Sequence, residues 1–300
     1  MTENINNKII AGHLMGGLGN QIFQIFATLS YGYEFNRQII FRYVKRSPGS
    51  EKRFTFWDTL FQELKHLTTF NSDITVDEIN KYPYYREGGH HWKPFKDNGN
   101  DKILLFGFYQ SHKYFEKHYE KIKNEIKLEK QKNEIKLKYI HYFDNVNGDI
   151  SSMHFRIGDY KWKQDCHPVM PCKYYELAIE ELLKHKSIKK IIYFFEKRDI
   201  DDVNNIIIKL KELYKNIEFI PIDHEIPDWE QLLLMSNCNH NIIANSSFSW
   251  WGGYFNDYKE KKVLYPCEWF GWKLQRNSVR DLFPNDWIKI KNIGLDIRKL

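Results

Sequence analysis

Strand-like and helix-like segments alternate through the second half of the chain, and this alternation restricts the fold more than any other feature of the sequence. Short apolar runs typical of buried strands are separated by longer segments with apolar residues at three- and four-residue spacing, typical of helices. The expected strands are GDISSMHF, KIIYFFE, IEFIPI, HNIIAN and KVLYP, and the expected helices are YYELAIEELLKH, VNNIIIKLKELY, WEQLLLMSNC and SFSWWGGYF. The alternation predicts a doubly wound α/β domain with a parallel sheet.

The first hundred residues contain a second, less regular unit of the same kind. Strands are expected over 8–15, 38–43 and 102–109. A helix is expected over 21–35, where Ile22, Phe26 and Leu29 follow helical spacing. From 44 to 100 the pattern is broken by turn residues and aromatic side chains. The first strand, the helix and the second strand predict a βαβ unit, the beginning of another parallel sheet.

A Lys/Glu-rich segment, 116–140, is expected to separate the two halves. Within it, KNEIKL occurs at 123–128 and again at 132–137. On one continuous helix, an offset of nine residues turns the second copy to the opposite face, so the repetition predicts a solvated helix and no structural repeat. We expect two Rossmann-like lobes, 1–145 and 146–300, with a ligand site between them at the carboxyl ends of the strands.

Net charge, cysteine spacing and hydropathy restrict the ligands and the cellular compartment that suit this chain. The 45 Lys and Arg residues exceed the 39 Asp and Glu residues only slightly, which suits an anionic small molecule or an acidic membrane surface and argues weakly for nucleic acid. Four cysteines without zinc-ligand spacing predict free thiols in a reducing compartment. The polar N-terminus and the lack of bilayer-length apolar runs predict a cytoplasmic protein, with peripheral contact to the inner face of a membrane left open. The oligomeric state is left open too.

The first motif is GGLGNQ, between an expected strand and an expected helix. Its glycines let the backbone approach a ligand at a helix N-terminus, where free N–H groups favour anions. It lacks the last glycine of a dinucleotide fingerprint and the Gly-Lys-Ser/Thr of a P-loop. A plain tight turn is the alternative. Asn20 favours a ligand site, because a carboxamide both donates and accepts hydrogen bonds.

The second motif, HFRIGDY, comes directly after an expected strand. Arg156 can bind a phosphate through two parallel N–H groups, and Gly158 permits a sharp turn. Asp159 can fix the arginine or accept from a ribose hydroxyl, and His154 shares the face of Arg156. A purely structural ion pair between Arg156 and Asp159 is the alternative interpretation.

The third motif, NSSFSWWGGYF, follows another expected strand. Ser246 or Ser247 suits the N-cap of a helix, and two hydroxyls there can bind phosphate. Trp250 and Trp251 are expected in the core. Elsewhere, the acids of DHE (223–225) could bind a divalent metal, but a turn is the favoured interpretation.

In this order, the segments GGLGNQIFQIFA, GFYQSHKYF, HFRIGDY, HPVMPCKYYELAI, LLLMSNCNHNIIANSSFSWWGGYF and LFPNDWIKI resemble the α-1,2-fucosyltransferases of glycosyltransferase family 11. The resemblance covers most of the chain except about 44–100. It implies a GT-B-like α/β fold with the active site in the cleft between two lobes, acceptor side first and donor side second. It also implies a GDP-β-L-fucose donor, inversion at the sugar carbon, no cofactor or metal, and transfer to O2 of a terminal β-galactoside on a glycan.

The resemblance also implies roles for individual residues. Arg156 matches the arginine that contacts the donor β-phosphate, and Asn20 matches the asparagine of the N-terminal motif. The expected catalytic residues are Arg156, Asp159, His154 and Asn20. The expected donor-binding residues are Gly17, Gly19, Asn20, His154, Arg156, Asp159, Glu230, Gln231, Asn245, Ser246, Ser247 and Phe248. The base that takes the acceptor proton is open between Asp159, His154 and an acid of the first lobe.

Two departures from the family pattern concern the donor. Ile157 replaces the second arginine of HxRRGDY, and Gln231 replaces an acid that could read guanine, with Glu230 beside it. A different nucleotide-deoxysugar donor is therefore an alternative, as are a metal-dependent enzyme using Asp223 and Glu225 and a non-catalytic glycan- or polyanion-binding module. Aromatic residues of 44–100 are expected to form the acceptor platform: Trp57, Tyr82, Tyr84, Tyr85 and Trp92.

Overall fold

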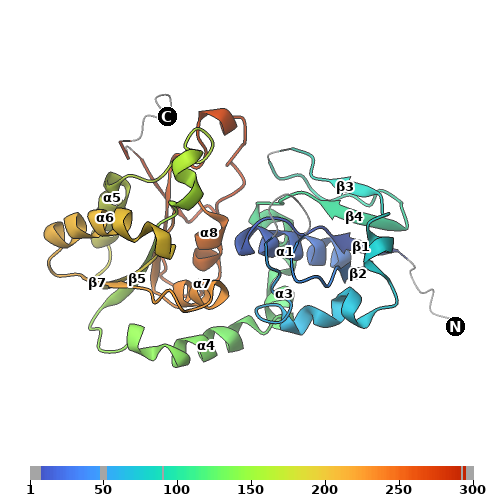
Figure 1. The fold of residues 1–300 in the computed structure, drawn as a ribbon, viewed down its shortest axis with the longest axis horizontal. Coiled ribbons are helices and arrows are strands. Elements are labelled where there is room, and N and C mark those ends of the chain that lie inside the picture. The colour runs from blue at the N-terminus through green and yellow to red at the C-terminus, as the bar shows by residue number, and fades with distance from the viewer. Residues whose placement is uncertain (1–7, 48–52, 90, 292, 295–300) are drawn as a thin grey trace. The chain divides into compact units, whose positions relative to one another are not determined.

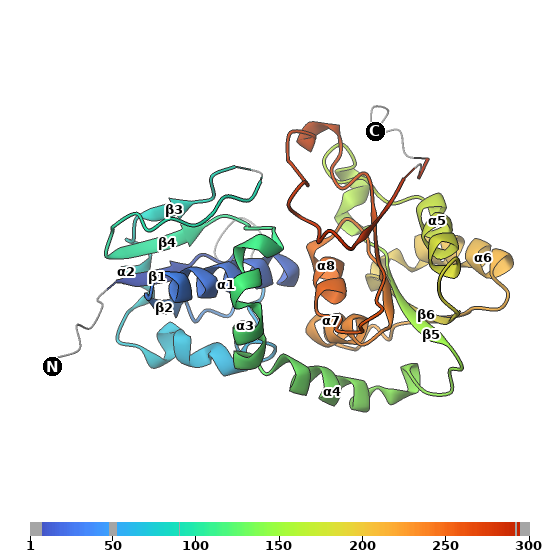
Figure 2. The same ribbon diagram turned by 180° about the vertical axis from the view of Figure 1, so that it is seen from behind.

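The computed structural model describes residues 8–47, 53–89, 91–291 and 293–294. The chain forms two compact units, Met1–Lys130 with Ser278–Phe283, and Gln131–Asn277 with Pro284–Leu300. Each unit contains its own parallel sheet (Figures 1 and 2). The expected α/β class with two Rossmann-like units is therefore confirmed. None of the helices in the described ranges has both the length and the apolarity that crossing a bilayer requires.

The first unit is built on a four-stranded sheet in the order β2-β1-β4-β3, with every neighbouring pair parallel. Its strands are β1 Ile9–Gly12, β2 Gln38–Phe41, β3 Tyr84–Arg86 and β4 Lys102–Phe106. Its helices are α1 Leu18–Glu34, α2 Val76–Ile79 and α3 Tyr119–Glu125, with 3-10 helices at Gln62–Leu67, Thr69–Asn71, His112–Tyr114 and Glu116–His118. The sequence did not predict β3, because Tyr84–Arg86 contains no run of aliphatic residues.

Helix α1 begins three residues earlier than its apolar spacing predicts. Gly16 has φ of +76°, a left-handed conformation that glycine adopts without strain, and Gly17 is the N-cap. Gly19 and Asn20 consequently lie in the first helical turn instead of a loop.

The Lys/Glu-rich segment folds as two helices instead of one continuous helix. Helix α3 is followed by α4, Leu128–Lys138, and Lys127 between them has φ of +53°. Ile126 and Ile135, which occupy the same place in the two KNEIKL copies, are both buried. The leucines at the last place of the two copies differ, since Leu128 is buried and Leu137 is 71% exposed, and the copies belong to different units.

The second unit is built on a six-stranded parallel sheet in the order β10-β9-β8-β5-β6-β7. Its strands are β5 Asp149–His154, β6 Ile188–Phe194, β7 Glu218–Pro221, β8 His240–Ile242, β9 Val263–Pro266 and β10 Ile288–Ile290. Its longer helices are α5 Cys172–Leu183, α6 Ile200–Leu213, α7 Asp228–Ser236 and α8 Ser247–Tyr254. Its 3-10 helices are η5 Ile140–Tyr142, η6 Gly158–Trp162, η7 Lys197–Asp199 and η8 Trp272–Leu274.

Every strand and helix expected in this unit is present, and β10 was missed. Numbered within the unit, the strand order is 3-2-1-4-5-6, the order of the dinucleotide-binding fold. Helices α5 and α6 cover one face of the sheet, and α7 and α8 cover the other (Figures 1 and 2). Trp250 and Trp251 are fully buried, which confirms their expected place in the core.

Candidate functional site

Two of the motifs leave the second sheet at its topological switch point. After β7 the chain crosses back to β8, which pairs with β5 through Ser151–His240, Ser152–Asn241 and Met153–Ile242. HFRIGDY runs on from the end of β5 and NSSFSWW follows β8, so both emerge at the same edge of the sheet. Ligands of open α/β sheets bind at this crevice, outside the carboxyl ends of the strands.

The two motifs also touch. The Tyr160 hydroxyl donates to the carbonyl oxygen of Asn245 at 3.3 Å, and the rings of His154 and Phe248 lie 5.6 Å apart between centroids. The structure therefore brings together residues more than eighty positions apart in the sequence.

His154 ends β5 and is buried. Burial, helped by the positive charge of Arg156, lowers the pKa of His154 from 6.5 to about 3, so its imidazole is neutral at physiological pH. Its Nδ1 atom is buried and has no hydrogen-bond partner within the described residues. A neutral imidazole with so low a pKa is a weak base and better suited to hydrogen bonding.

Arg156 is held by two carboxylates. Its Nη2 contacts Asp159 and its Nη1 contacts Glu196, while the guanidinium carbon lies 4.5 Å from the centroid of the Tyr160 ring. The Arg156–Asp159 ion pair considered as an alternative is thus present. Glu196 was missed, and its signal was available, since it is an acid just after a buried strand, β6.

Asp159 is the more exposed of the candidate bases. Partial burial opposes ionisation, but Arg156 and Lys163 hold the pKa of Asp159 below its usual value. The Lys163 Nζ lies 3.4 Å from Oδ2 of Asp159. The carboxylate is therefore ionised at neutral pH and weakly basic.

The loop after β5 is tied to the start of α6. Gly158 has φ of +37°, and its amide donates to Oδ2 of the buried Asp199 at 2.8 Å. Helix α6 begins at Ile200 with Asp201 and Asp202 in its first turn, where carboxylates favour the helix dipole.

Residues 245–248 form the start of α8. Ser246 is its N-cap, and its hydroxyl accepts from the amide of Phe248 at 3.3 Å, which confirms the expected cap. Asn245 is buried, and its Nδ2 donates to the carbonyl oxygens of Pro168 and Trp269. Its Oδ1 has no hydrogen-bond partner in the described part of the chain. Ser247 is the first helical residue and is half-buried.

Glu230 and Gln231, on α7, have local partners. The buried Glu230 carboxylate accepts from Lys138 Nζ at 3.0 and 2.8 Å and from the Tyr139 hydroxyl at 2.6 Å. Gln231 Nε2 donates to the carbonyl oxygen of Ile226 at 2.8 Å. A base-reading role for Glu230 would have to share its oxygens with these donors, and that role stays a prediction.

Three expected site residues, Gly17, Gly19 and Asn20, belong to the first unit. Asn20 Oδ1 accepts from Gln110 Nε2 at 2.8 Å, so the carboxamide is oriented by the loop that follows β4. The expected acceptor platform is partly wrong, because Trp57 and Tyr82 are buried in the core.

Asp223 and Glu225 form a turn in which the Glu225 amide donates to Asp223 Oδ1 at 2.9 Å. Across the ranges that the structure describes, no group of three or more His, Cys, Asp or Glu side chains could hold a metal ion. All four cysteines are free, as expected.

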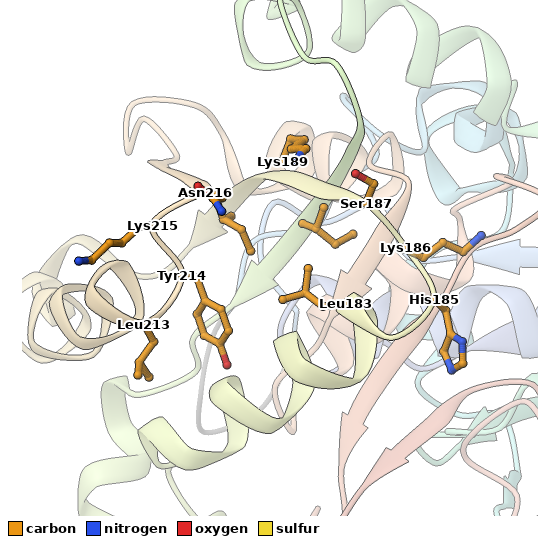
Figure 3. Close-up of a pocket in the computed structure, with 11 residues that line it drawn as sticks. Leu183, His185, Lys186, Ser187, Lys189, Leu213, Tyr214, Lys215 and Asn216 are labelled. Atoms are coloured by element: carbon orange, nitrogen blue, oxygen red, sulfur yellow. The ribbon is translucent and has the colours of Figure 1, made fainter.

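A cavity of about 570 Å³ opens at the amino ends of strands β6 and β7, opposite the end from which the motifs emerge (Figure 3). It is lined by residues 183, 185–189 and 213–217, which end α5 and α6 and begin or precede β6 and β7. The three motifs contribute nothing to it, so the cavity is not part of the candidate site.

A family model described as Glycosyl transferase family 11 matches residues 13–291. An α-1,2-colitosyltransferase of Escherichia coli is 26% identical over 301 residues, 95% of this chain and 99% of that protein. The O-antigen biosynthesis glycosyltransferase WbnK of Escherichia coli is 31% identical over 161 residues, 50% of this chain and 49% of that protein. Among solved structures, POFUT1 in complex with GDP-fucose is 14% identical, with a TM-score of 0.48, over 87% of this chain and 98% of that one. The match across nearly the whole chain shows that this protein belongs to glycosyltransferase family 11 and is a glycosyltransferase.

Proposed function

We propose that the protein transfers L-fucose from GDP-β-L-fucose to O2 of a terminal β-galactoside of a glycan, with inversion and without a metal. The observation that supports this most is the convergence of HFRIGDY and NSSFSWW at the switch point of the second sheet. We assign the donor to this second unit and the acceptor to the unit that contains α1.

In the reaction, the bond between fucose C1 and the β-phosphate oxygen breaks, and C1 forms a bond to the acceptor oxygen on the opposite face. The acceptor hydroxyl proton passes to a base, and GDP leaves with the bonding electron pair. The transition state carries positive charge on the sugar and negative charge on the diphosphate. The principal task of the protein is to stabilise that negative charge with donors already in place.

Arg156 is the main donor for the departing diphosphate in this proposal. A guanidinium has five N–H groups, so its contacts with Asp159 and Glu196 leave donor capacity for phosphate oxygens. The hydroxyls of Ser246 and Ser247 and the first amides of α8 add donors at a helix N-terminus. Two buried polar atoms, Nδ1 of His154 and Oδ1 of Asn245, suit further hydrogen bonds to the nucleotide sugar.

The base that takes the acceptor proton is a carboxylate in this proposal. The low pKa of His154 argues against this residue as the base, since a base with a pKa of about 3 accepts a proton poorly at neutral pH. Asp159 is ionised and half-buried, and an acid of the first unit is the other candidate. Asn20 positions the acceptor or the phosphate, because a carboxamide is not usefully basic.

The name of one relative supports a different donor sugar as the alternative. The Escherichia coli protein aligned over 95% of this chain is named an α-1,2-colitosyltransferase. Colitose is fucose without its 3-hydroxyl group, so the same diphosphate-binding groups could serve either donor. The replacements at Ile157 and Gln231 leave room for such a change in donor.

The proposed function is tested by incubating purified protein with GDP-fucose or nucleotide-activated colitose and a panel of β-galactosides. The linkage and anomeric configuration of the product are read by NMR. An α-1,2-linked fucoside as the product supports the main proposal. If an α-1,2-linked colitoside forms far faster, the donor sugar is colitose and not fucose. Hydrolysis or no reaction with either donor would contradict both.

A further inference from the structure

Two arginines converge on one glycine at the carboxyl edge of the second sheet. A Cβ atom on Gly158 would stand 2.6 Å from Nη2 of Arg198 and 2.9 Å from Nη1 of Arg156. The Glu196 Oε1 atom would lie 3.2 Å from the same point. Residues 156 and 198 lie on different loops, one after β5 and one after β6, so this convergence exists only in the folded sheet.

Glu196 joins the two guanidinium groups. Its Oε1 contacts Nη1 of Arg156, and its Oε2 lies 2.6 Å from Nη2 of Arg198. One carboxylate thus links two cations in the way that a phosphate group with several oxygens can.

The position of Arg198 is fixed by its neighbour. Arg198 lies in η7, and the next residue, Asp199, is buried and accepts the hydrogen bond from the Gly158 amide. This bond holds the loop of Arg156 against the start of α6. The backbone of Arg198 is therefore anchored beside the site, while its side chain, 60% exposed, can reorient.

Ile157 has an uncharged hydrocarbon side chain, and it is buried in the core with Phe155 and Met170. The charged groups that face Arg156 are Asp159, Glu196 and, through Glu196, Arg198, with Lys163 paired to Asp159. A diphosphate that entered this cluster would meet two guanidinium groups from two loops.

We propose that Arg198 is a second diphosphate-binding residue. Glu196 pairs with Arg156 and with Arg198 and so positions both guanidinium groups to bind the diphosphate of the donor. The inference rests on the proposed donor function and deepens it. On binding, diphosphate oxygens accept from guanidinium N–H groups that Glu196 does not engage, and both guanidinium groups face the charge that develops as the sugar leaves. Arg198 is the more exposed partner, so it contributes more to capture of the nucleotide than to the bond-breaking step.

The test compares Arg198→Ala and Arg198→Lys with Lys197→Ala in the full chain. Lys197 is the matched control, since it is the preceding residue, carries the same charge and has a 75% exposed side chain paired with Glu225 at 3.5 Å. Calorimetry measures binding of GDP, guanosine and inorganic pyrophosphate at fixed salt, and thermal unfolding checks that each variant is folded. Initial rates with GDP-fucose give KM and kcat separately.

For Arg198→Ala we expect GDP and pyrophosphate affinity to fall about 10- to 100-fold, the scale of one lost charge-assisted contact. Guanosine affinity should be unchanged, KM should rise more than kcat falls, and Arg198→Lys should recover part of the loss. Lys197→Ala should match the wild type.

Equal GDP and pyrophosphate affinity in Arg198→Ala and wild type would overturn the inference while leaving the donor function intact. Wild-type protein could instead bind pyrophosphate but not GDP, with Arg198→Ala losing the pyrophosphate binding. That result would support the role of Arg198 in binding diphosphate and would reject the GDP-linked donor. Binding of neither probe by wild-type protein would reject both.

Discussion

The amide nitrogen of Gly158 donates a 2.8 Å hydrogen bond to Oδ2 of Asp199, and this bond links the loop after β5 to the start of α6. The two residues lie 41 positions apart, and both are buried. Arg156 and Arg198 are their near neighbours in sequence, so this hydrogen bond ties together the two loops that carry the guanidinium groups.

Replacing Asp199 by alanine should destabilise the protein. The buried Gly158 amide would lose its acceptor, which costs about 1–3 kcal/mol of unfolding free energy. Urea unfolding monitored by circular dichroism measures the loss. Asp201→Ala, at an exposed position in the first turn of α6, is the control and should stay within about 0.5 kcal/mol of wild type. Equal stability of the two variants would contradict the role given to the bond.

Gly158→Ala should impair nucleotide binding as well as stability. Its φ of +37° is strained for alanine at a cost on the order of 1 kcal/mol, and the new Cβ would collide with both guanidinium groups. GDP affinity should fall because Arg156 and Arg198 must move apart. Gly88→Ala is the control, since its Cβ would meet only the flexible Lys93 side chain. Wild-type GDP affinity in Gly158→Ala would show that the arginines need not converge.

Arg156→Ala should fold normally and lose transfer activity. Glu196 keeps a partner in Arg198, so the substitution strands no buried charge. The loss in kcat should be about 100- to 1,000-fold, the scale of a removed oxyanion-stabilising donor. Steady-state kinetics measure it, with Arg280→Ala, 71% exposed, as the control. Activity within a few-fold of wild type would leave Arg156 with only its structural ion pairs.

His154 should make stability depend on pH. Burial first, and the Arg156 charge second, lower the pKa of His154 in the folded protein to about 3 from the ordinary histidine value of 6.5. Between these values the unfolded chain binds a proton that the folded chain does not, so stability falls as pH falls. Between pH 7 and pH 5 the loss attributable to this group is about 2 kcal/mol.

His154→Gln, which cannot be protonated, should remove that part of the slope. Urea unfolding of both proteins at pH 5, 6, 7 and 8 isolates the difference, which should be constant between pH 7 and 8 and shrink towards pH 5. Parallel curves across the whole range would mean that His154 is not the group responsible.

Chelation should leave transfer unchanged, because guanidinium, hydroxyl and amide donors serve the diphosphate in the proposed mechanism. Initial rates with and without EDTA test this. Loss of activity that manganese restores would instead favour a site at Asp223 and Glu225. Asp223→Ala would then be inactive as well, whereas the metal-free mechanism predicts near wild-type rates for it.

Local sequence predicted the elements of the second unit well, because strand and helix periodicity are properties of short segments. It failed where local signal is weak or interrupted. Strands β3 and β10 contain no run of consecutive aliphatic residues, whereas β8, which is equally short, ends at Ile242 and is followed by Ile243 and Ala244. One continuous helix was expected over the KNEIKL copies, because no local pattern indicated the left-handed residue at Lys127 that ends the first helix. Trp57 and Tyr82 were expected in the acceptor platform but are buried, since an aromatic residue type alone does not reveal whether its side chain is buried.

The sequence by itself determined the α/β class, the motifs at strand ends and the family, because each depends on residue types at short and fixed spacing. Only the tertiary structure decided that β5 lies beside β8, that Glu196 rather than Asp159 alone holds Arg156, and that Arg198 reaches the same glycine. These are contacts between segments some forty to ninety residues apart. They follow from the order of strands in the sheet, which long-range packing fixes and local patterns do not encode.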